Sequence, residues 1–281
     1  MTGELVPGVT LGQRVGPFEH RLDTDLLRRY AAATRDPSPR AQAGETVPPA
    51  AIVTSIWDAQ NTAREALVSH EIRQLAAGGV HGEHDILLHR PILPGEPLRI
   101  WVDGWGARPA GRNSRLTLRY VAIDTDDDVV AEQWWTTVFL GVTCARVGSD
   151  PPEHAFPEAA RQHPMGTWVA DVDQDMARQY AEVSGDWSAH HFDLEAARAS
   201  GFDRLFLHGL CTMALCAHGV VQLVADGHPE RVRRVAVRFA TPTFLGEQLA
   251  VHVFDAGPTG YAFEADSAGA RVISNRRVEL V

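Results

Sequence analysis

The chain has 281 residues, of which 44% are hydrophobic, and its formal net charge is −10. A chain of this length can bury a substantial core, as one large domain or as two ordinary ones. The negative charge and the lack of a lysine and arginine cluster among aromatic residues argue against a nucleic-acid-binding surface. The cysteines, three in number, do not suit a disulfide framework, so we expect a reducing, cytoplasmic location.

The amino-terminal sequence, MTGELVPGVTLGQRVG, lacks the basic run and the apolar stretch of a secretion signal. No window of the sequence approaches the roughly 18 consecutive apolar residues that a membrane-spanning helix needs. We therefore expect neither export nor membrane insertion.

Two segments recur at nearly the same offset, which indicates an internal duplication. YAAATRD, beginning at Tyr30, returns as YAEVSGD at Tyr180, an offset of 150. RPILPGEPLRIWV, beginning at Arg90, returns as TPTFLGEQLAVHV at Thr241, an offset of 151. We expect an N-terminal repeat over residues 1–145, a linker over 146–160 that contains Pro, Gly and Ser, and a C-terminal repeat over 161–281.

In each repeat the predicted elements follow the same order. A short helix comes first, then a polar loop, then a longer helix, over Pro48 to Leu67 in the first repeat and Gly209 to Gly227 in the second. The second of these helices is apolar nearly all round but too short to span a membrane, so we expect it to be buried. Segments rich in β-forming residues follow each helix, and the acidic stretch Asp124 to Asp128 is predicted to be a turn between two strands.

The short helix of the second repeat is predicted from apolar residues at helical spacing, with aspartates near its amino end. These apolar positions are Val172, Met176, Tyr180 and Val183. An α+β fold in which an antiparallel sheet wraps around a central helix, made twice, satisfies the whole pattern.

The loop after Tyr180 places Asp186, His190 and His191 within six residues. Taken alone, such a group can be a helix cap or a solvated turn. Gly209, where the buried helix begins, strengthens a functional interpretation. The first N–H groups of a helix lack internal acceptors, and a residue without a side chain lets one of them approach a ligand oxygen. A carboxylate, an imidazole and an exposed amide donor together could form a hydration site.

At these residues the sequence resembles the MaoC-like hydratase/dehydratase family, which includes the (R)-specific enoyl-CoA hydratases of the hotdog fold. The matching positions fall in the loop, in the His-Gly step that follows it, and in a strand further on. They are Tyr180, Ser184, Gly185, Asp186, His191, Asp193, Ala197, Gly201, Phe202, His208, Gly209, Arg238, Phe239, Pro242 and Gly246. With the duplication, the resemblance covers nearly the whole chain as a double hotdog.

The resemblance implies a hydro-lyase that interconverts (3R)-3-hydroxyacyl and trans-2-enoyl thioesters, carried on coenzyme A or on an acyl carrier protein. Asp186 and His191 would be the catalytic pair, and the N–H of Gly209 would stabilise the thioester oxygen. Substrate contacts would come from neighbours of these three residues: Trp187, Ser188, His208 and Leu210. The resemblance implies no cofactor and no metal, and a homodimer is the expected assembly.

Two departures from the family pattern bear on this expectation. The family's Asn-Pro after the aspartate is Ser188-Ala189 here, which keeps a hydrogen-bonding group but removes a rigid residue. This change raises the alternative of a specialised enzyme acting on a polyketide-type substrate. In the first repeat Asp36 is retained, but the position five residues later is Ala41. We expect that repeat to have no catalytic activity and to form a wall of the acyl-binding site. Asp36 is expected to be a turn or cap residue. A non-catalytic acyl-thioester-binding protein is the other alternative.

Other chemically suggestive residues have structural interpretations. His81 and His84 lack the ligand spacing of a metal site, apart from Glu83 and Asp85, and His89 is predicted to lie in a strand. We expect Trp134 and Trp135 to pack in the sheet, and His218 to be a hydrogen-bonded histidine of the core. None of these three residues is therefore predicted to belong to the functional site.

Overall fold

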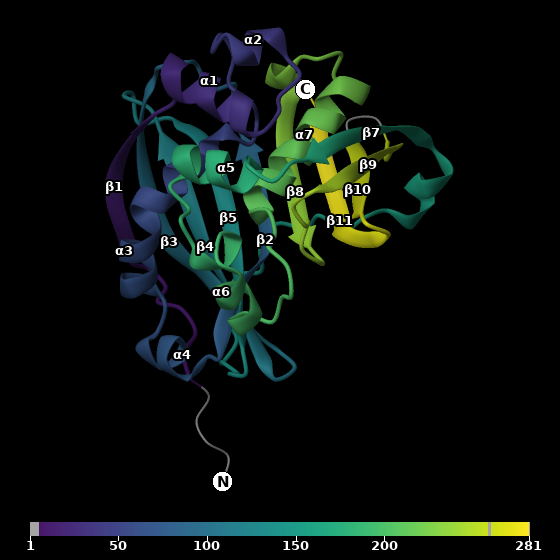
Figure 1. Ribbon diagram of the computed structural model, residues 1–281. Helices are drawn as coiled ribbons and strands as arrows, with labels where there is room; N and C mark the ends of the chain where they lie inside the picture. The colour runs from purple at the N-terminus through teal and green to yellow at the C-terminus, as the bar shows by residue number, and fades with distance from the viewer. Residues whose placement is uncertain (1–5, 258–259, 281) are drawn as a thin grey trace.

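The computed structural model describes residues 6–257 and 260–280. Its strands form an 11-stranded sheet whose named pairs are antiparallel, in the order β1-β3-β4-β5-β2-β8-β11-β10-β9-β7, with β6 paired to β3 (Figure 1). The strands are β1 (Arg14–Arg21), β2 (Gly78–Leu88), β3 (Pro97–Ala110), β4 (Asn113–Ile123), β5 (Val129–Leu140), β6 (Val147–Gly148), β7 (Pro164–Val172), β8 (Val232–Phe239), β9 (Glu247–Asp255), β10 (Gly260–Ser267) and β11 (Ala270–Leu280).

The sheet order repeats itself about its centre. Reading outward from the β2–β8 pair gives β5, β4, β3 and β1 on one side and β11, β10, β9 and β7 on the other. The two sets follow the chain in the same sequence, so each half of the sheet is one copy of a five-stranded unit. This arrangement is the double hotdog architecture predicted from the sequence.

The helices lie against this sheet and in the loops around it (Figure 1). They are α1 (Thr24–Ala33), α2 (Pro39–Gln42), α3 (Ile56–Leu67), α4 (His70–Leu75), α5 (Met176–Ser184), α6 (Leu194–Ala199) and α7 (Gly209–Val224). Short 3-10 helices cover Ala51–Ser55, Glu158–Gln162, Ala189–His191 and Pro229–Arg231.

Helix α7 is the buried central helix of the second repeat. Every residue from Leu210 to Val221 is buried, as its uniformly apolar sequence predicts. Trp168 of β7 packs so closely that a Cβ on Gly219 would lie 3.0 Å from the indole ring. A helix without a polar face in a 281-residue chain therefore marks the centre of one repeat.

The counterpart in the first repeat differs from the expected buried helix. Residues 48–67 divide into a 3-10 helix, Ala51–Ser55, and then α3. Only one stripe of α3 is buried, through Ile56, Ala59, Ala63 and Leu67. The charged and polar residues between these four positions require solvent on the other face. The helix therefore covers β1 and β3 instead of filling the centre of the sheet.

Several details of the predicted elements were wrong. Each repeat begins with a strand, β1 or β7, before its first helix, and neither strand was predicted. Val172 is the last residue of β7 and not part of the helix, which begins at Met176. His89 follows β2 and lies outside it. The acidic turn at Asp124 to Asp128 does join β4 to β5, as predicted.

The core is continuous across both repeats and includes the three cysteines, each of which is buried. Trp134 and Trp135 are 5% and 7% exposed in β5, as expected for sheet packing. None of the described helices is long and apolar enough to cross a membrane.

Candidate active site

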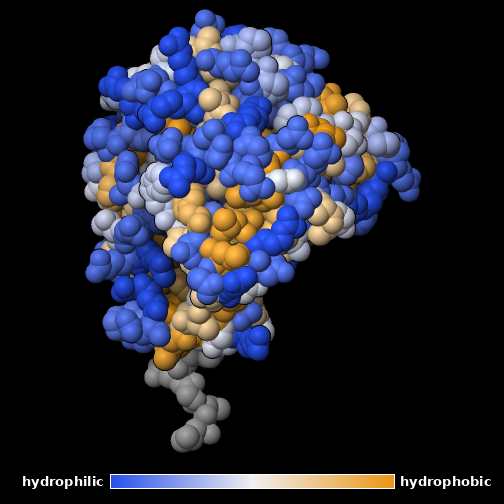
Figure 2. Space-filling view, viewed as in Figure 1, coloured by the Kyte–Doolittle hydropathy of each residue, from blue (hydrophilic) through white to orange (hydrophobic). Residues whose placement is uncertain are grey.

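The loop that carries Asp186 begins at Gly185, directly after α5. Gly185 has φ +81°, a left-handed conformation that disfavours residues with a side chain, and it ends the helix. A Cβ on Gly185 would also lie 3.3 Å from the Cβ of Trp57, at the start of α3. The loop is therefore turned by a glycine and pressed against the first repeat. Figure 2 shows apolar side chains gathered near the middle of this face, and Trp187 in this loop is 53% exposed.

The carboxylate of Asp186 is buried and held in one orientation. Its Oδ1 accepts two hydrogen bonds from Ser188, one from the backbone N–H at 3.0 Å and one from Oγ at 2.6 Å. These bonds occupy one oxygen and leave Oδ2 to face the two histidines nearby. Ser188 thus supplies the short hydrogen-bonding group expected at this position, and it binds Asp186 directly.

His191 turns an unprotonated nitrogen toward Asp186. Its Nδ1 lies 3.0 Å from the backbone oxygen of Phe206, and because a carbonyl only accepts, Nδ1 carries the hydrogen. Nε2 is then a lone-pair acceptor in the neutral ring, 4.0 Å from Asp186 Oδ2. The two atoms are thus both acceptors, and they face each other too far apart for a direct hydrogen bond.

His208 supports the loop from behind. Its Nε2 donates to the backbone oxygen of Asp186 at 2.9 Å, and its ring centroid lies 3.7 Å from that of His191. His208, which we expect to contact substrate, also holds the backbone of the loop that carries Asp186. His190 lies at the edge of the group, with its ring stacked on Phe206.

Burial keeps His191 and His208 neutral. Burial, and then the neighbouring His208 and His190, lower the pKa of His191 to about 3. Burial also lowers the pKa of His208 to about 4. The Asp186 charge favours the protonated form of His191 but does not overcome these effects. At neutral pH the site therefore presents a neutral imidazole as a proton acceptor.

Gly209 is the first residue of α7, directly after His208. Its surface is partly exposed, whereas Leu210 is 4% exposed and belongs to the core. A Cβ on Gly209 would lie 3.1 Å from the ring of Phe239, so the aromatic ring packs directly on the glycine. The absence of a side chain lets Phe239 pack here and leaves the first N–H of the helix near the surface.

Aromatic residues of the first repeat continue the packing that begins with Phe239 on Gly209. The sequence did not predict this arrangement. The ring of His81 is 4.9 Å from Phe239 and stacks on Trp135 at 3.6 Å. Trp135 meets Trp57 edge to face, and Trp57 lies against Gly185. These rings form a continuous arc from Gly209 back to the loop of Asp186. His81 was considered only as a metal ligand, because no local pattern shows which residues of one repeat face the other.

The equivalent loop of the first repeat is built on the same turn but has Ala41 where the second repeat has His191. Asp36 Oδ1 accepts from the N–H of Ser38 at 2.9 Å, as Asp186 does from Ser188. Asp36 is thus the expected turn residue. Its Oδ2 lies 3.4 Å from Nδ1 of His218, whose Nε2 is 3.0 Å from Thr34 Oγ1. His218 is the hydrogen-bonded core histidine that we expected.

Asp186, His191 and His208 present ligand atoms within 4.8 Å of one another, a group that could hold a metal ion. The Nε2 of His208 lies 3.9 Å from Asp186 Oδ2. A coordinating nitrogen must be unprotonated, whereas this Nε2 donates its hydrogen to a carbonyl. With His208 Nε2 as a ligand atom, these three residues therefore do not fit a metal ion.

Comparison with known proteins places this geometry in a family. Residues 155–270 match the family model described as MaoC like domain. Residues 155–270 therefore form a MaoC-like domain. The chain is 37% identical over 100 residues to mouse "Peroxisomal multifunctional enzyme type 2", covering 35% of this chain and 14% of that protein. It is 27% identical over 193 residues to "3-hydroxyacyl-thioester dehydratase Y" of Mycobacterium tuberculosis, covering 68% of this chain and 66% of that protein.

These matches span less than two thirds of the length of the curated relatives. Among solved structures, a MaoC-like dehydratase from Phytophthora capsici superposes with a TM-score of 0.83 at 19% identity, covering 96% of this chain and 95% of that one. A Mycobacterium tuberculosis protein described as a double hotdog fold superposes with a TM-score of 0.59 at 16% identity, covering 98% of each chain. These likenesses show the double hotdog fold.

Proposed function

We propose that this MaoC-like protein is a hydro-lyase that interconverts (3R)-3-hydroxyacyl and trans-2-enoyl thioesters. The observation that carries the proposal is the pair of acceptor atoms, Asp186 Oδ2 and His191 Nε2, 4.0 Å apart in a buried loop. The names of the relatives, hydratases and dehydratases of acyl thioesters, support the same reaction.

A water molecule that donates one hydrogen to each acceptor, at about 2.8 Å, would fit between them. Both its hydrogens would then be engaged, and its lone pair would face the substrate. In hydration the oxygen forms a bond to the β-carbon of the enoyl thioester while the pair takes up one proton. The pair then delivers that proton to the α-carbon, so that one water is added in total; dehydration reverses the same steps.

The N–H of Gly209 would stabilise the negative charge that develops on the thioester oxygen during this addition. The amino end of α7 carries free N–H groups and the positive end of the helix dipole. The reaction needs no redox cofactor or metal, because proton transfer and charge stabilisation supply its chemistry.

The remaining site assignments belong to the same proposal. Trp187 would contact the substrate from the exposed side of the loop, and Ser188, His208 and Leu210 would shape the site around it. In the proposed division, residues 1–145 form a non-catalytic repeat, 146–160 a linker and 161–281 the catalytic repeat. Two observations support it: Ala41 stands where a catalytic histidine would be, and the family match begins at residue 155. We also propose coenzyme A or an acyl carrier protein as the carrier, a homodimer and a cytoplasmic location.

The direct test is to mix the protein with a trans-2-enoyl-CoA and follow the absorbance of the conjugated thioester. The proposal predicts loss of absorbance and a product of (3R) configuration, and loss of turnover in His191→Ala. A protein that only binds acyl thioesters would bind the compound and leave its absorbance unchanged. A panel of substrates addresses the polyketide-type alternative raised by Ser188-Ala189, because rapid turnover of simple enoyl-CoAs would count against it.

A further inference from the structure

Asp186 is held in place by one hydrogen bond from outside its own loop. Its backbone N–H donates to Oγ of Ser184 at 3.2 Å, and its Oδ1 accepts the two bonds from Ser188. Its backbone oxygen accepts from Nε2 of His208 at 2.9 Å, across 22 positions of the chain. Among the described residues, no other hydrogen bond reaches Asp186 from outside residues 184–188. The local bonds therefore shape the loop, and the bond from His208 sets where the loop lies.

His208 is itself fixed to the amino end of α7. It is 1% exposed and directly precedes Gly209, the first residue of the helix. Its backbone oxygen accepts from the N–H of Thr212 at 3.0 Å, as the oxygen of a helix cap residue does. The donor that holds the loop of Asp186 is therefore carried by the same helix end that presents the N–H of Gly209.

The ring of His208 also contacts the second member of the proposed catalytic pair. The centroids of the His208 and His191 rings lie 3.7 Å apart, with their planes inclined by 31°. His208 thus contacts Asp186 through a hydrogen bond and His191 through its ring, and a peptide bond joins it to Gly209. One buried residue therefore connects the three groups assigned to the reaction.

The equivalent carbonyl of the first repeat takes its hydrogen bond from a nearby residue. The backbone oxygen of Asp36 accepts from Nε2 of Gln42 at 2.8 Å, across 6 positions of the chain. Glutamine and histidine both present an N–H donor near the end of the side chain. The carbonyl thus has a donor in both repeats, but beside Asp186 the donor comes from the start of the buried central helix.

The segment that leads into His208 is tied to the turn between β8 and β9. The N–H of Leu207 donates to the backbone oxygen of Thr243 at 2.8 Å. Arg204 donates to Oε1 of Glu247, the first residue of β9, at 2.8 Å. His208 is thus held by the segment before it as well as by the helix after it.

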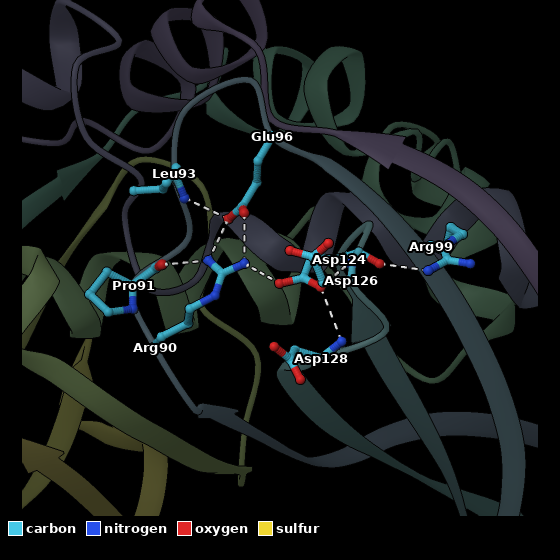
Figure 3. Close-up of polar contacts among 8 residues, drawn as sticks. All are labelled: Arg90, Pro91, Leu93, Glu96, Arg99, Asp124, Asp126 and Asp128. Atoms are coloured by element: carbon cyan, nitrogen blue, oxygen red, sulfur yellow. Dashed lines mark hydrogen bonds and ion pairs between the residues drawn. The ribbon is translucent and has the colours of Figure 1, made fainter.

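Glu247 has its counterpart in Glu96 of the first repeat, 151 positions earlier in the duplicated segment. Figure 3 shows that Glu96 binds within its own turn. Arg90 donates to both of its carboxylate oxygens, at 3.0 and 2.8 Å, and the N–H of Leu93 donates at 2.6 Å. The first repeat thus uses the duplicated glutamate locally, as it uses the carbonyl of Asp36. In the second repeat both counterparts bind the segment that ends at the start of α7.

The proposed reaction requires two parts of the substrate to be held at once. Water would add to the β-carbon beside the Asp186–His191 pair, whereas negative charge would develop on the thioester oxygen at the amide of Gly209. The separation of these groups must match the conjugated part of the substrate, and a misplacement of about 1 Å can lower a rate about 100-fold. A hydrogen bond from the residue before Gly209 to the backbone of Asp186 controls this separation.

We propose that His208 is a positioning residue that sets the distance between the Asp186–His191 pair and the amide of Gly209. The inference rests on the hydro-lyase function proposed above. His208 acts through the groups that it holds and transfers no proton itself. Its Nε2 hydrogen is engaged by a carbonyl, and its Nδ1 is buried without a hydrogen-bond partner among the described residues.

Two substitutions separate this hydrogen bond from the bulk of the side chain. His208→Leu fills similar space without a donor, whereas His208→Gln keeps an N–H, the donor that Gln42 supplies to Asp36. We expect kcat for an enoyl thioester to fall about 10- to 100-fold in His208→Leu, with KM changed less than about threefold, because the substrate still binds but its reacting atoms are misaligned. His208→Gln should recover most of that rate. Equal losses in the two variants, or full activity in His208→Leu, would overturn the proposal.

NMR of the whole protein, labelled with isotopes, tests the geometry without turnover. We expect the ring hydrogen of His208 on Nε2 in the unchanged protein. The carbonyl-carbon signal of Asp186 should shift strongly in His208→Leu and weakly in His208→Gln, because only the first variant loses the donor.

The methyl signals of Ile86, which is fully buried in β2, report whether each variant is folded. If His208→Leu does not fold, the position of the ring hydrogen and the rate of His208→Gln decide. A ring hydrogen on Nδ1 of His208, or an Asp186 signal that shifts equally in the two variants, would overturn the proposal. Absence of turnover in the unchanged protein, with this hydrogen bond present, would refute the proposed hydration alone.

Discussion

The hydroxyl of Ser188 donates a 2.6 Å hydrogen bond to Oδ1 of Asp186, in addition to the bond from its own backbone N–H. This contact aims Oδ2 at His191. A serine at this position therefore acts on the orientation of the carboxylate, and it does so where relatives in the family pattern have asparagine.

Ser188→Ala removes the side-chain bond and keeps the backbone bond, so Asp186 gains rotational freedom. We expect kcat to fall about tenfold, the effect of about 1.4 kcal/mol, with KM changed less than twofold. Steady-state kinetics with an enoyl thioester measures both values. Ser188→Thr keeps a hydroxyl and should restore most of the rate; equal loss in the two variants would contradict a role for this hydrogen bond.

Gly209→Ala tests the close packing of Phe239 on the amino end of α7. The added Cβ would lie 3.1 Å from the ring, so the ring or the helix must shift by a few tenths of an ångström. We expect turnover to fall at least about tenfold while the unfolding midpoint changes little, because Ala favours helix.

The double variant Gly209→Ala/Phe239→Leu relieves the contact and should recover part of the lost turnover. If Gly209→Ala retains full activity, the amide at this position does not need the observed alignment.

Acid should destabilise the protein through its buried histidines. The pKa values of His191 and His208 are lowered by burial to about 3 and about 4, below the ordinary 6.5. Between pH 6.5 and these values the unfolded chain binds more protons, so the stability that is fully present above pH 6.5 is lost as the pH falls. Each group contributes a slope of up to about 1.4 kcal/mol per pH unit.

Urea unfolding at pH 7, 6 and 5 would measure this slope. His208→Gln should reduce it, whereas replacement of the exposed His70 by Gln should leave it unchanged. Identical slopes in the wild-type protein and His208→Gln would contradict the assignment of a buried, neutral imidazole.

Asp36→Ala provides a structural counterpart to changes at Asp186. Asp36 accepts from Ser38 and lies beside His218, but no histidine equivalent to His191 faces it. We expect the free energy of unfolding to fall by about 1–3 kcal/mol, with turnover per folded molecule unchanged. Loss of turnover in the folded Asp36→Ala protein would show that the first repeat takes part in the reaction.

The sequence predicted the features that are local or repeated. The offset of 151 between the repeats reappears as the Asp85–Ala236 pair at the centre of the sheet, and the apolar helix after Gly209 is buried as expected. The loop motif placed Asp186 and His191 five residues apart, and a 3-10 turn between them brings their side chains to 4.0 Å.

What the sequence did not predict depends on contacts between the repeats. His81 and Trp135 join the row of rings that begins at Phe239 because β2 pairs with β8, a contact with no signature in either strand alone. The first-repeat helix was expected to be buried, but its polar residues direct α3 to the side of the sheet. The strands β1 and β7 were missed because their exposed, mixed sequences alternate only weakly.

The central claim is that Asp186 and His191 together activate water, and Asp186→Asn tests it most directly. The variant keeps the size of the side chain but removes its negative charge. Hydration of an enoyl thioester, followed by absorbance, should be at least about 100-fold slower, with an unfolding midpoint close to that of the unchanged protein. Asp186→Asn that hydrates the same substrate within twofold of the unchanged protein would contradict the account.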